Sequence, residues 1–311
     1  MLCYPPGQAL LEGAQGRYEK EKPSLKPLIT FYLQVYKKQK EMMTEIAPVM
    51  TRPEALQREQ KTEEPILQNK TLLISAEAVE KMLRAVTAAF RECFPSVSSG
   101  NGNLADKIVL PALSAIQDSL TAEMLGRAEQ VTLARLQQLL SRLHAGGPAE
   151  EKLYAASAQL LRLAVQPYYV QYAAQLPDAG RFAHWDRGVC PVCGDAPLLA
   201  VLRDEDGKKM LECSLCHWQW PVTRLLCPAC GCSNHEALAF FYNPREKYRR
   251  VYVCNDCHTY LKTTVLRESP GPVIADMENA ATLTLDLLAQ REGYRALCPE
   301  LQATLITGEV K

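Results

Sequence analysis

The feature that most constrains the fold of this chain is a group of four C-x-x-C pairs between residues 190 and 257. A C-x-x-C turn holds two thiolates close enough to bind one tetrahedral metal ion, and two such turns joined by a hairpin complete a closed four-sulfur site. Four pairs therefore predict two metal sites. The predicted ligands are Cys190, Cys193, Cys213, Cys216, Cys227, Cys230, Cys254 and Cys257.

An internal duplication indicates how the pairs combine. The segment C-P-V-C-G at 190–194 recurs as C-P-A-C-G at 227–231, and C-S-L-C-H at 213–217 recurs as C-N-D-C-H at 254–258. The gap between the two pairs is 19 residues in the first copy and 23 in the second, close to the usual spacing of four-cysteine sites. We therefore expect two sequential sites, and a cross-braced arrangement that joins the first pair to the third stays open.

The other four of the 12 cysteines are Cys3, Cys93, Cys232 and Cys298. The first residues show no charged segment leading into an apolar core, so we expect a chain that is not exported, whose thiols stay reduced rather than forming disulfides. Cys93 is expected to be a small core residue. Cys232 is either a loop residue or a non-ligand thiol close enough to a metal site for thiol chemistry or ligand exchange.

Apolar residues at three- and four-residue spacing predict helices in the N-terminal part. The runs cover residues 79–90, 131–143 and 153–176, with Ser75 as a helix start. Pro167 lies inside the third run and is expected to kink or divide that helix. A helical bundle is the predicted arrangement.

Beyond residue 180 the pattern changes to short strand-like segments joined by turns, which are too small to bury a core alone and need a metal. We predict an α+β chain. Its parts are an all-α helical domain at 1–180, two small rubredoxin-like or zinc-ribbon β-hairpin metal modules at 181–224 and 225–268, and a C-terminal helix and tail at 269–311.

Two other uses of C-x-x-C fit less well. Thioredoxin-like redox chemistry uses one pair at the start of a helix, whereas four pairs on hairpins are present here. Both C-x-x-C-H segments satisfy the haem-attachment pattern, but haem would leave the two C-P-x-C-G turns without partners. His217 and His258 are therefore interpreted as flanking hairpin residues. A four-thiolate cage suits zinc and iron equally.

The charge distribution argues against nucleic acid as a partner. The whole chain has 35 Lys and Arg residues and 35 Asp and Glu residues. Residues 181–268 contain 12 Lys and Arg residues and 10 Asp and Glu residues. The basic cluster at Arg245, Lys247, Arg249 and Arg250 is interpreted as a solvated hairpin tip, so a strongly basic face is missing. No apolar run approaches the roughly 18–20 residues of a membrane span. Without a recognisable catalytic arrangement, we expect a protein-binding chain that is not an enzyme.

The middle segment resembles the formate dehydrogenase accessory protein family of the FdhE type. The resemblance rests on C-P-V-C-G-D-A-P at 190–197, L-E-C-S-L-C at 211–216 with Trp220, Arg224 before C-P-A-C-G, Y-V-C-N-D-C at 252–257 and Y-L-K at 260–262. A-D at 275–276, L-T-L-D at 283–286 and E-G-Y at 292–294 extend it. The end differs, because C-P-E at 298–300 stands where the family has N-P-F.

The resemblance implies a cytoplasmic, non-catalytic chaperone-like accessory protein. It would bind the catalytic subunit of a molybdenum- or tungsten-dependent formate dehydrogenase and support its maturation. The family's cysteine knuckles form rubredoxin-like sites associated with iron, which implies iron at both sites here, with zinc as the alternative metal. Arg224, Asp276 and Asp286 are weaker candidates for contacts to the partner, since helix capping and surface pairing explain them at least as well.

Two rival functions stay open. A homo-oligomeric state of the chain also stays open. A rubredoxin-type electron carrier predicts reversible iron redox chemistry in the isolated chain. A nucleic-acid-binding zinc ribbon, the less favoured rival, predicts salt-sensitive binding to DNA or RNA.

Overall fold

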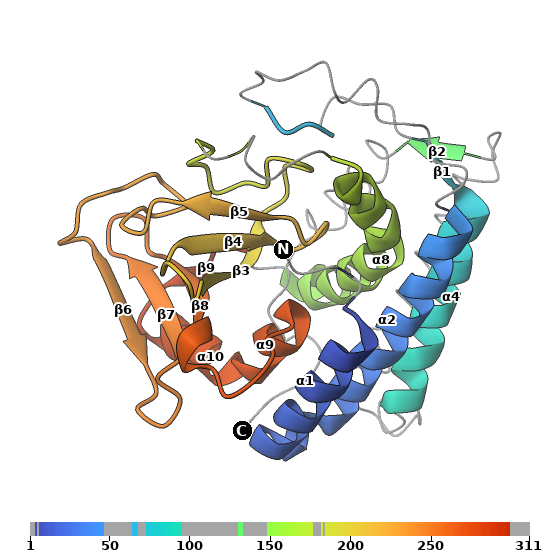
Figure 1. The fold of residues 1–311 in the computed structure, drawn as a ribbon, viewed down its shortest axis with the longest axis horizontal. Helices are drawn as coiled ribbons and strands as arrows, with labels where there is room; N and C mark the ends of the chain where they lie inside the picture. The colour runs from blue at the N-terminus through green and yellow to red at the C-terminus, as the bar shows by residue number, and fades with distance from the viewer. Residues whose placement is uncertain are drawn as a thin grey trace.

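The computed structural model describes residues 6–46, 64–67, 73–94, 130–132, 148–176 and 184–298, together with Tyr4 and Phe182. The predicted boundary near residue 180 and the tail after Cys298 lie outside these residues. Within the described ranges, the α+β class is confirmed: N-terminal helices precede strands that carry the two cysteine groups. In Figure 1 the N-terminal helices lie together on one side and the sheet lies on the other.

The described residues of the N-terminal part form four long helices with one short 3-10 turn. The helices pack through buried aromatic and aliphatic side chains, among them Phe31, Tyr36, Leu83 and Leu163. The elements are α1 (Gln8–Glu21), η1 (Pro23–Leu25), α2 (Lys26–Ile46), α4 (Ala76–Cys93) and α8 (Pro148–Ala174).

Local sequence signals determine where α4 begins. Ser75 caps this helix, and its hydroxyl oxygen accepts a hydrogen bond from the Ala78 N–H at 3.2 Å. Glu77 in the first turn places a negative charge at the positive end of the helix dipole. The predicted helix start is confirmed.

Pro167 lies within α8, which is one helix in the structure. The expected division at this proline is therefore wrong. Residues 160–170 are buried throughout, so packing on all sides of the helix offsets the backbone hydrogen bond that a proline removes.

The second predicted helical run begins in a strand instead. β1 (Leu73–Ser75) and β2 (Gln130–Thr132) pair antiparallel, with Ile74 opposite Val131. The helical prediction is wrong for residues 131–132, where two consecutive β-branched residues favour an extended backbone. The rest of that run lies outside the described residues.

The cysteine-rich part forms one seven-stranded sheet. Its order is β5-β4-β3-β8-β7-β6, with β9 paired to β8. The two hairpin copies join where β3 runs parallel to β8, with Ala200 opposite Thr263. The strands are β3 (Pro197–Leu202), β4 (Lys209–Cys213), β5 (Gln219–Val222), β6 (Leu238–Tyr242), β7 (Arg249–Cys254), β8 (Thr259–Val265) and β9 (Arg295–Ala296).

The predicted C-terminal helix forms as two consecutive segments after η4 (Leu266–Glu268). These are α9 (Ala275–Ala281) and α10 (Leu283–Arg291). They separate at Thr282, whose hydroxyl donates to the backbone carbonyl of Glu278 at 2.7 Å. Val251 and Tyr260 of the sheet pack against Leu285 and Ala289 of α10.

A buried ion-pair network ties the sheet to the helices. The Glu278 carboxylate on α9 accepts hydrogen bonds from Arg249 Nε on β7 at 2.8 Å and from the Tyr18 hydroxyl on α1 at 2.6 Å, and Arg17 lies 3.3 Å away. Arg249 is 1% exposed, so its assignment to a solvated tip is wrong. Its neighbours Arg245 and Lys247 are exposed as expected.

No helix within the described ranges combines the length and the apolar character needed to cross a lipid bilayer.

Candidate metal centres

The first C-x-x-C turn has the same backbone structure in both copies. The Gly194 N–H donates to the Cys190 carbonyl at 2.9 Å, and the Gly231 N–H donates to the Cys227 carbonyl at the same distance. Both glycines adopt left-handed backbone conformations, with φ of 81° and 74°. Glycine enters this region without the steric cost of a Cβ atom, which explains why it ends both C-P-x-C turns.

The second turn of each copy ends in a histidine with a similar backbone. His217 and His258 have φ values of 53° and 54°, the two positive values found at non-glycine residues among those described. Neither histidine belongs to a four-cysteine group. Both therefore flank the turns, as the sequence predicts.

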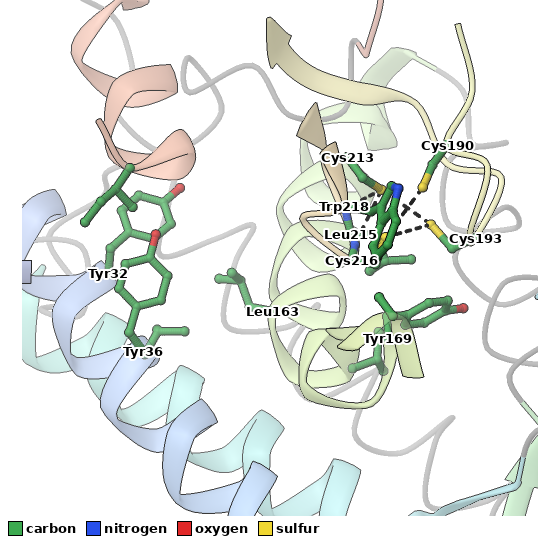
Figure 2. Close-up of a cluster of buried hydrophobic side chains, with 14 of the residues drawn as sticks. Tyr32, Tyr36, Leu163, Tyr169, Cys190, Cys193, Cys213, Leu215, Cys216 and Trp218 are labelled. Atoms are coloured by element: carbon green, nitrogen blue, oxygen red, sulfur yellow. Dashed lines mark hydrogen bonds between the residues drawn. The ribbon is translucent and has the colours of Figure 1, made fainter. Parts of the chain in front are cut away.

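Four cysteines of the first copy bring their sulfurs together. The Sγ–Sγ distances are 3.4 Å for Cys193–Cys213, 3.5 Å for Cys190–Cys216 and 3.6 Å for Cys193–Cys216. A tetrahedral ion with bonds of about 2.3 Å to sulfur places its ligands about 3.8 Å apart. Figure 2 shows the four side chains converging beside Trp218, with Tyr169 of α8 nearby. The group could hold a metal ion.

The first group is closed off from solvent. Its four cysteines are at most 3% exposed and belong to the same buried cluster as the side chains of α2, α4 and α8. Burial raises the pKa of Cys193 well above that of a free thiol, and likewise that of Cys216. Such buried thiols need a cation beside them to be held as thiolates, which fits a metal-binding role.

The four cysteines of the second copy form an equivalent group. Its Sγ–Sγ distances are 3.7 Å for Cys227–Cys257 and 3.8 Å for Cys230–Cys254, also as expected for a tetrahedral metal site. This group is less enclosed: Cys230 is exposed and Cys257 is half-buried. It could hold a metal ion with one edge toward solvent.

The sulfurs are grouped sequentially within each copy. All eight predicted residues fall into these two groups, and the described residues show no cross-braced group. That the eight thiolates bind metal stays a prediction.

Cys232 lies beside the second group. Its sulfur is within 4.8 Å of the Cys254 sulfur and of a carboxylate oxygen of Asp256. A hydrogen bond to Asp256 raises the pKa of Cys232 to about 11, so its thiol is mostly protonated at neutral pH. The thiol lies close to the second cysteine group, and both interpretations of Cys232 from the sequence stay open.

The remaining lone thiols lie apart from both groups. Cys93 is half-buried at the end of α4, where its sulfur lies 3.8 Å from the Gln34 side-chain oxygen. Cys298 is buried. Cys3 lies outside the described residues.

His217 joins the first group to the helices. Its ring stacks on Tyr4, with centroids 3.7 Å apart. Its Nδ1 lies 3.0 Å from Glu212 on β4, and its Nε2 lies 3.2 Å from the Gln166 amide on α8. Asp276 faces the same nitrogen at 3.7 Å. The turn next to Cys216 is thus held by a buried polar network.

Two weaker candidates from the sequence have internal partners. Asp276 accepts a hydrogen bond from Tyr36 at 2.9 Å, and Asp286 pairs with Lys262 at 2.7 Å. Both carboxylates are buried, so in this conformation Asp276 joins α9 to α2 and Asp286 joins α10 to β8, rather than facing a partner. Arg224 is exposed and lies at the wall of a cavity beside Cys227.

Comparison with known proteins supports the resemblance on which the sequence interpretation rests. A family model described as the central domain of FdhE matches residues 189–224, which include the first cysteine group. The crystal structure of the FdhE protein from Pseudomonas aeruginosa superposes with a TM-score of 0.61 at 20% identity, covering 96% of this chain and 97% of that one. This likeness shows that the fold is shared.

Curated relatives carry the same name. The chain is 28% identical over 193 residues to the FdhE homolog of Aquifex aeolicus, covering 60% of this chain and 66% of that protein. It is 26% identical over 218 residues to that of Haemophilus ducreyi, covering 69% and 63%. The chain therefore spans less than two thirds of these relatives' own lengths. Together these findings confirm the resemblance to the FdhE family.

Proposed function

We propose that this chain is a non-catalytic accessory protein for the maturation of a formate dehydrogenase. It binds the catalytic subunit of a molybdenum- or tungsten-dependent enzyme through its helical domain and its double four-cysteine module, and it acts in the cytoplasm. The observation that carries the proposal is the match of the FdhE central domain to residues 189–224, the segment that builds the first cysteine group.

The geometry of the cysteines supports a metal-dependent binding surface. The first group connects the sheet to the helical core, and the second lies toward the surface of the same sheet. On this proposal Cys190, Cys193, Cys213 and Cys216 hold one iron ion, with zinc as the alternative. Cys227, Cys230, Cys254 and Cys257 hold a second. The ions supply cross-links that fix the turns and hence the surface around them.

A pull-down from anaerobic extract tests the proposal. The tagged chain is expected to recover a formate dehydrogenase catalytic subunit, and Cys190→Ser and Cys227→Ser are each expected to reduce that recovery. Cys93→Ser is the matched control, because Cys93 lies outside both groups. Normal recovery with both sites emptied of metal would show that the cysteine turns play no part in binding.

Metal analysis tests the ligand assignment separately. The purified chain should contain two equivalents of iron or zinc, and each Cys→Ser variant should lose one. Full metal content in Cys190→Ser would contradict the assignment of that ligand.

The exposed position of Cys230 keeps a rubredoxin-type electron carrier as the second candidate, because a metal near the surface can exchange electrons with a partner. Reversible iron reduction in the isolated chain, combined with failure to recover the catalytic subunit, would favour that function.

A further inference from the structure

One face of the seven-stranded sheet packs against the helical core near β8 and lacks this cover near β6. Phe240 on β6 lies opposite Tyr252 on β7, which lies opposite Leu261 on β8, so these three side chains share a face. Leu261 belongs to the cluster that includes the helices. Toward β6 the same face loses this cover, and Figure 1 shows β6 at the margin of the molecule, away from the N-terminal helices.

The open half exposes large apolar side chains. Phe240 is 47% exposed and Tyr242 is 42% exposed, and Leu225 in the neighbouring loop is 56% exposed. Phe240 stacks on Tyr252 with ring centroids 5.2 Å apart, so the aromatic rings form a continuous surface. Leu288 on α10 is the other large apolar residue with comparable exposure in the described part of the chain. Clustering of this kind marks an interaction surface rather than scattered exposure.

A cavity of about 240 Å³ lies within this surface. Most of its wall is aliphatic or aromatic, and none of the residues that line it is acidic. The apolar wall includes Leu225, Leu238, Phe240, Val253, Leu261 and Leu297. Cys227 and Cys254 also line it, so the cavity adjoins the second cysteine group.

Two cations line the same cavity. Lys209 on β4 is 2% exposed, yet its ammonium rests over the Tyr252 ring, 5.1 Å from the centroid, and forms no ion pair with a described carboxylate. Arg224 is exposed at the wall. The Cys227 sulfur, which lines the same cavity, is the negative group that acts on Lys209. A carboxylate would add a second anionic partner for this buried ammonium, so the cavity suits a ligand that brings a carboxylate with an apolar group.

The backbone next to the cavity is also available. β6 pairs with β7 and is the terminal strand of the sheet in the described residues. The outer edge of such a strand presents N–H and C=O groups that an added extended segment can satisfy.

We propose that β6 and its cavity bind an extended segment of the catalytic subunit that carries an apolar side chain close to a carboxylate. This inference rests on the proposed function and names the chemistry of the partner. The segment pairs with the edge of β6, its apolar side chain enters the cavity, and its carboxylate meets Lys209 and Arg224.

Binding of the isolated catalytic subunit to the metal-loaded chain tests the surface. Phe240→Ser and Leu225→Ser are each expected to weaken binding at least about tenfold. Leu288→Ser is the matched control, since it removes an equally exposed apolar side chain from another surface, and it should bind as the original chain does. Undiminished binding by both variants would overturn this inference and leave the proposed function standing. Failure of the original chain to bind would overturn both.

Two dyes test the chemistry of the cavity without the partner. Anilinonaphthalene sulfonate has an apolar body and an anionic group, and phenylnaphthylamine has the same rings without the sulfonate. The original chain is expected to bind the anionic dye at least about tenfold more tightly, Lys209→Met to abolish this preference, and Leu225→Ser to weaken both dyes. Equal binding of the two dyes by the original chain would show that Lys209 serves only the charge of the thiolates, and would overturn the carboxylate assignment.

Discussion

β3 and β6 occupy the same position in two copies of one unit, since each follows the first C-x-x-C turn of its copy. Every residue of β3 is buried, whereas Phe240 and Tyr242 of β6 are exposed. The cysteines differ in the same way: Cys193 is 1% exposed and Cys230 is exposed. The turns themselves are nearly identical in backbone structure.

The difference shows which properties are local and which depend on surroundings. A turn of four or five residues determines how two sulfurs are presented. The elements packed against the turn determine whether the resulting site is part of the core or of the surface. One copy is therefore suited to hold the fold together and the other to meet a partner.

The largest effect should come from breaking the first group. Cys193→Ser would leave a metal site incomplete inside the main core, so we expect the melting temperature to fall by on the order of 10 °C or more. Cys230→Ser should lower it far less, because that cysteine lies at the surface. Thermal unfolding followed by circular dichroism measures both, and equal losses would show that the two copies contribute alike to stability.

The next largest effect should come from breaking the buried ion-pair network around Glu278, which connects the second copy to the helices. Glu278→Gln removes the fully buried carboxylate that Arg249 and Arg17 share, and leaves them with the more exposed Glu21 and Glu246. The expected cost is about 3 kcal/mol in unfolding free energy. Denaturant unfolding measures it. Asp206→Asn at an exposed turn, where Asp206 pairs with Arg203, is the control and should leave the stability unchanged.

The effect of Glu278→Gln on stability has a defined pH dependence. Burial acts to raise the pKa of Glu278, but the guanidinium of Arg249 lowers it overall below its usual value. A carboxylate with a lower pKa in the folded state stabilises the fold at pH values above its pKa in the unfolded state, about 4.3. This stabilisation is lost as the pH falls through the folded-state pKa. The stability gap between the original chain and Glu278→Gln should therefore shrink in acid; a constant gap would contradict the ionised state of Glu278.

Matched truncations in β3 and β6 should differ in size. Leu199→Ala creates a cavity at a side chain that is 1% exposed, and should cost about 2–5 kcal/mol. Phe240→Ala removes a half-exposed ring and should cost less than about 1 kcal/mol. Denaturant unfolding of the two variants provides the comparison, and a large loss in Phe240→Ala would mean that β6 is covered in solution.

The smallest effect on the fold is expected from limited metal removal. A chelator should extract about one equivalent quickly from the exposed second group and the other slowly, while the circular dichroism spectrum stays unchanged during the fast phase. Stopped-flow absorbance of the chelator complex measures the two phases. Release in a single phase would indicate that the exposure of Cys230 does not control access.

The sequence predicts those structural features that are determined within short segments of the chain. The cysteine grouping follows from turn spacing and duplication, and the start of α4 follows from Ser75. The sequence pattern does not reveal β5, because Pro221 lies within it and proline is confined to positions such as this edge strand. The burial of Arg249 depends on Glu278, 29 residues later, and no local pattern reveals such a partner.

The unequal exposure of the two copies could not be predicted for the same reason. The two copies have similar strand patterns and similar turns in their sequences. The helices that cover one of them are distant in the chain. An aromatic run at Phe240–Tyr242 is a partial signal, since three aromatic residues on a terminal strand suggest a binding edge, but the sequence does not say which strand is terminal.

The parallel pairing of β3 with β8 has a consequence for the order of events during synthesis. Ala200 lies opposite Thr263 in the parallel pair, so the backbone edge of β3 in the first hairpin stays unpaired until the second hairpin has been translated. Pairing over such a separation is slow because the loop must close before the contact contributes. Early metal capture by Cys190–Cys216 would hold the nascent first hairpin in place and shorten the search for its distant neighbour.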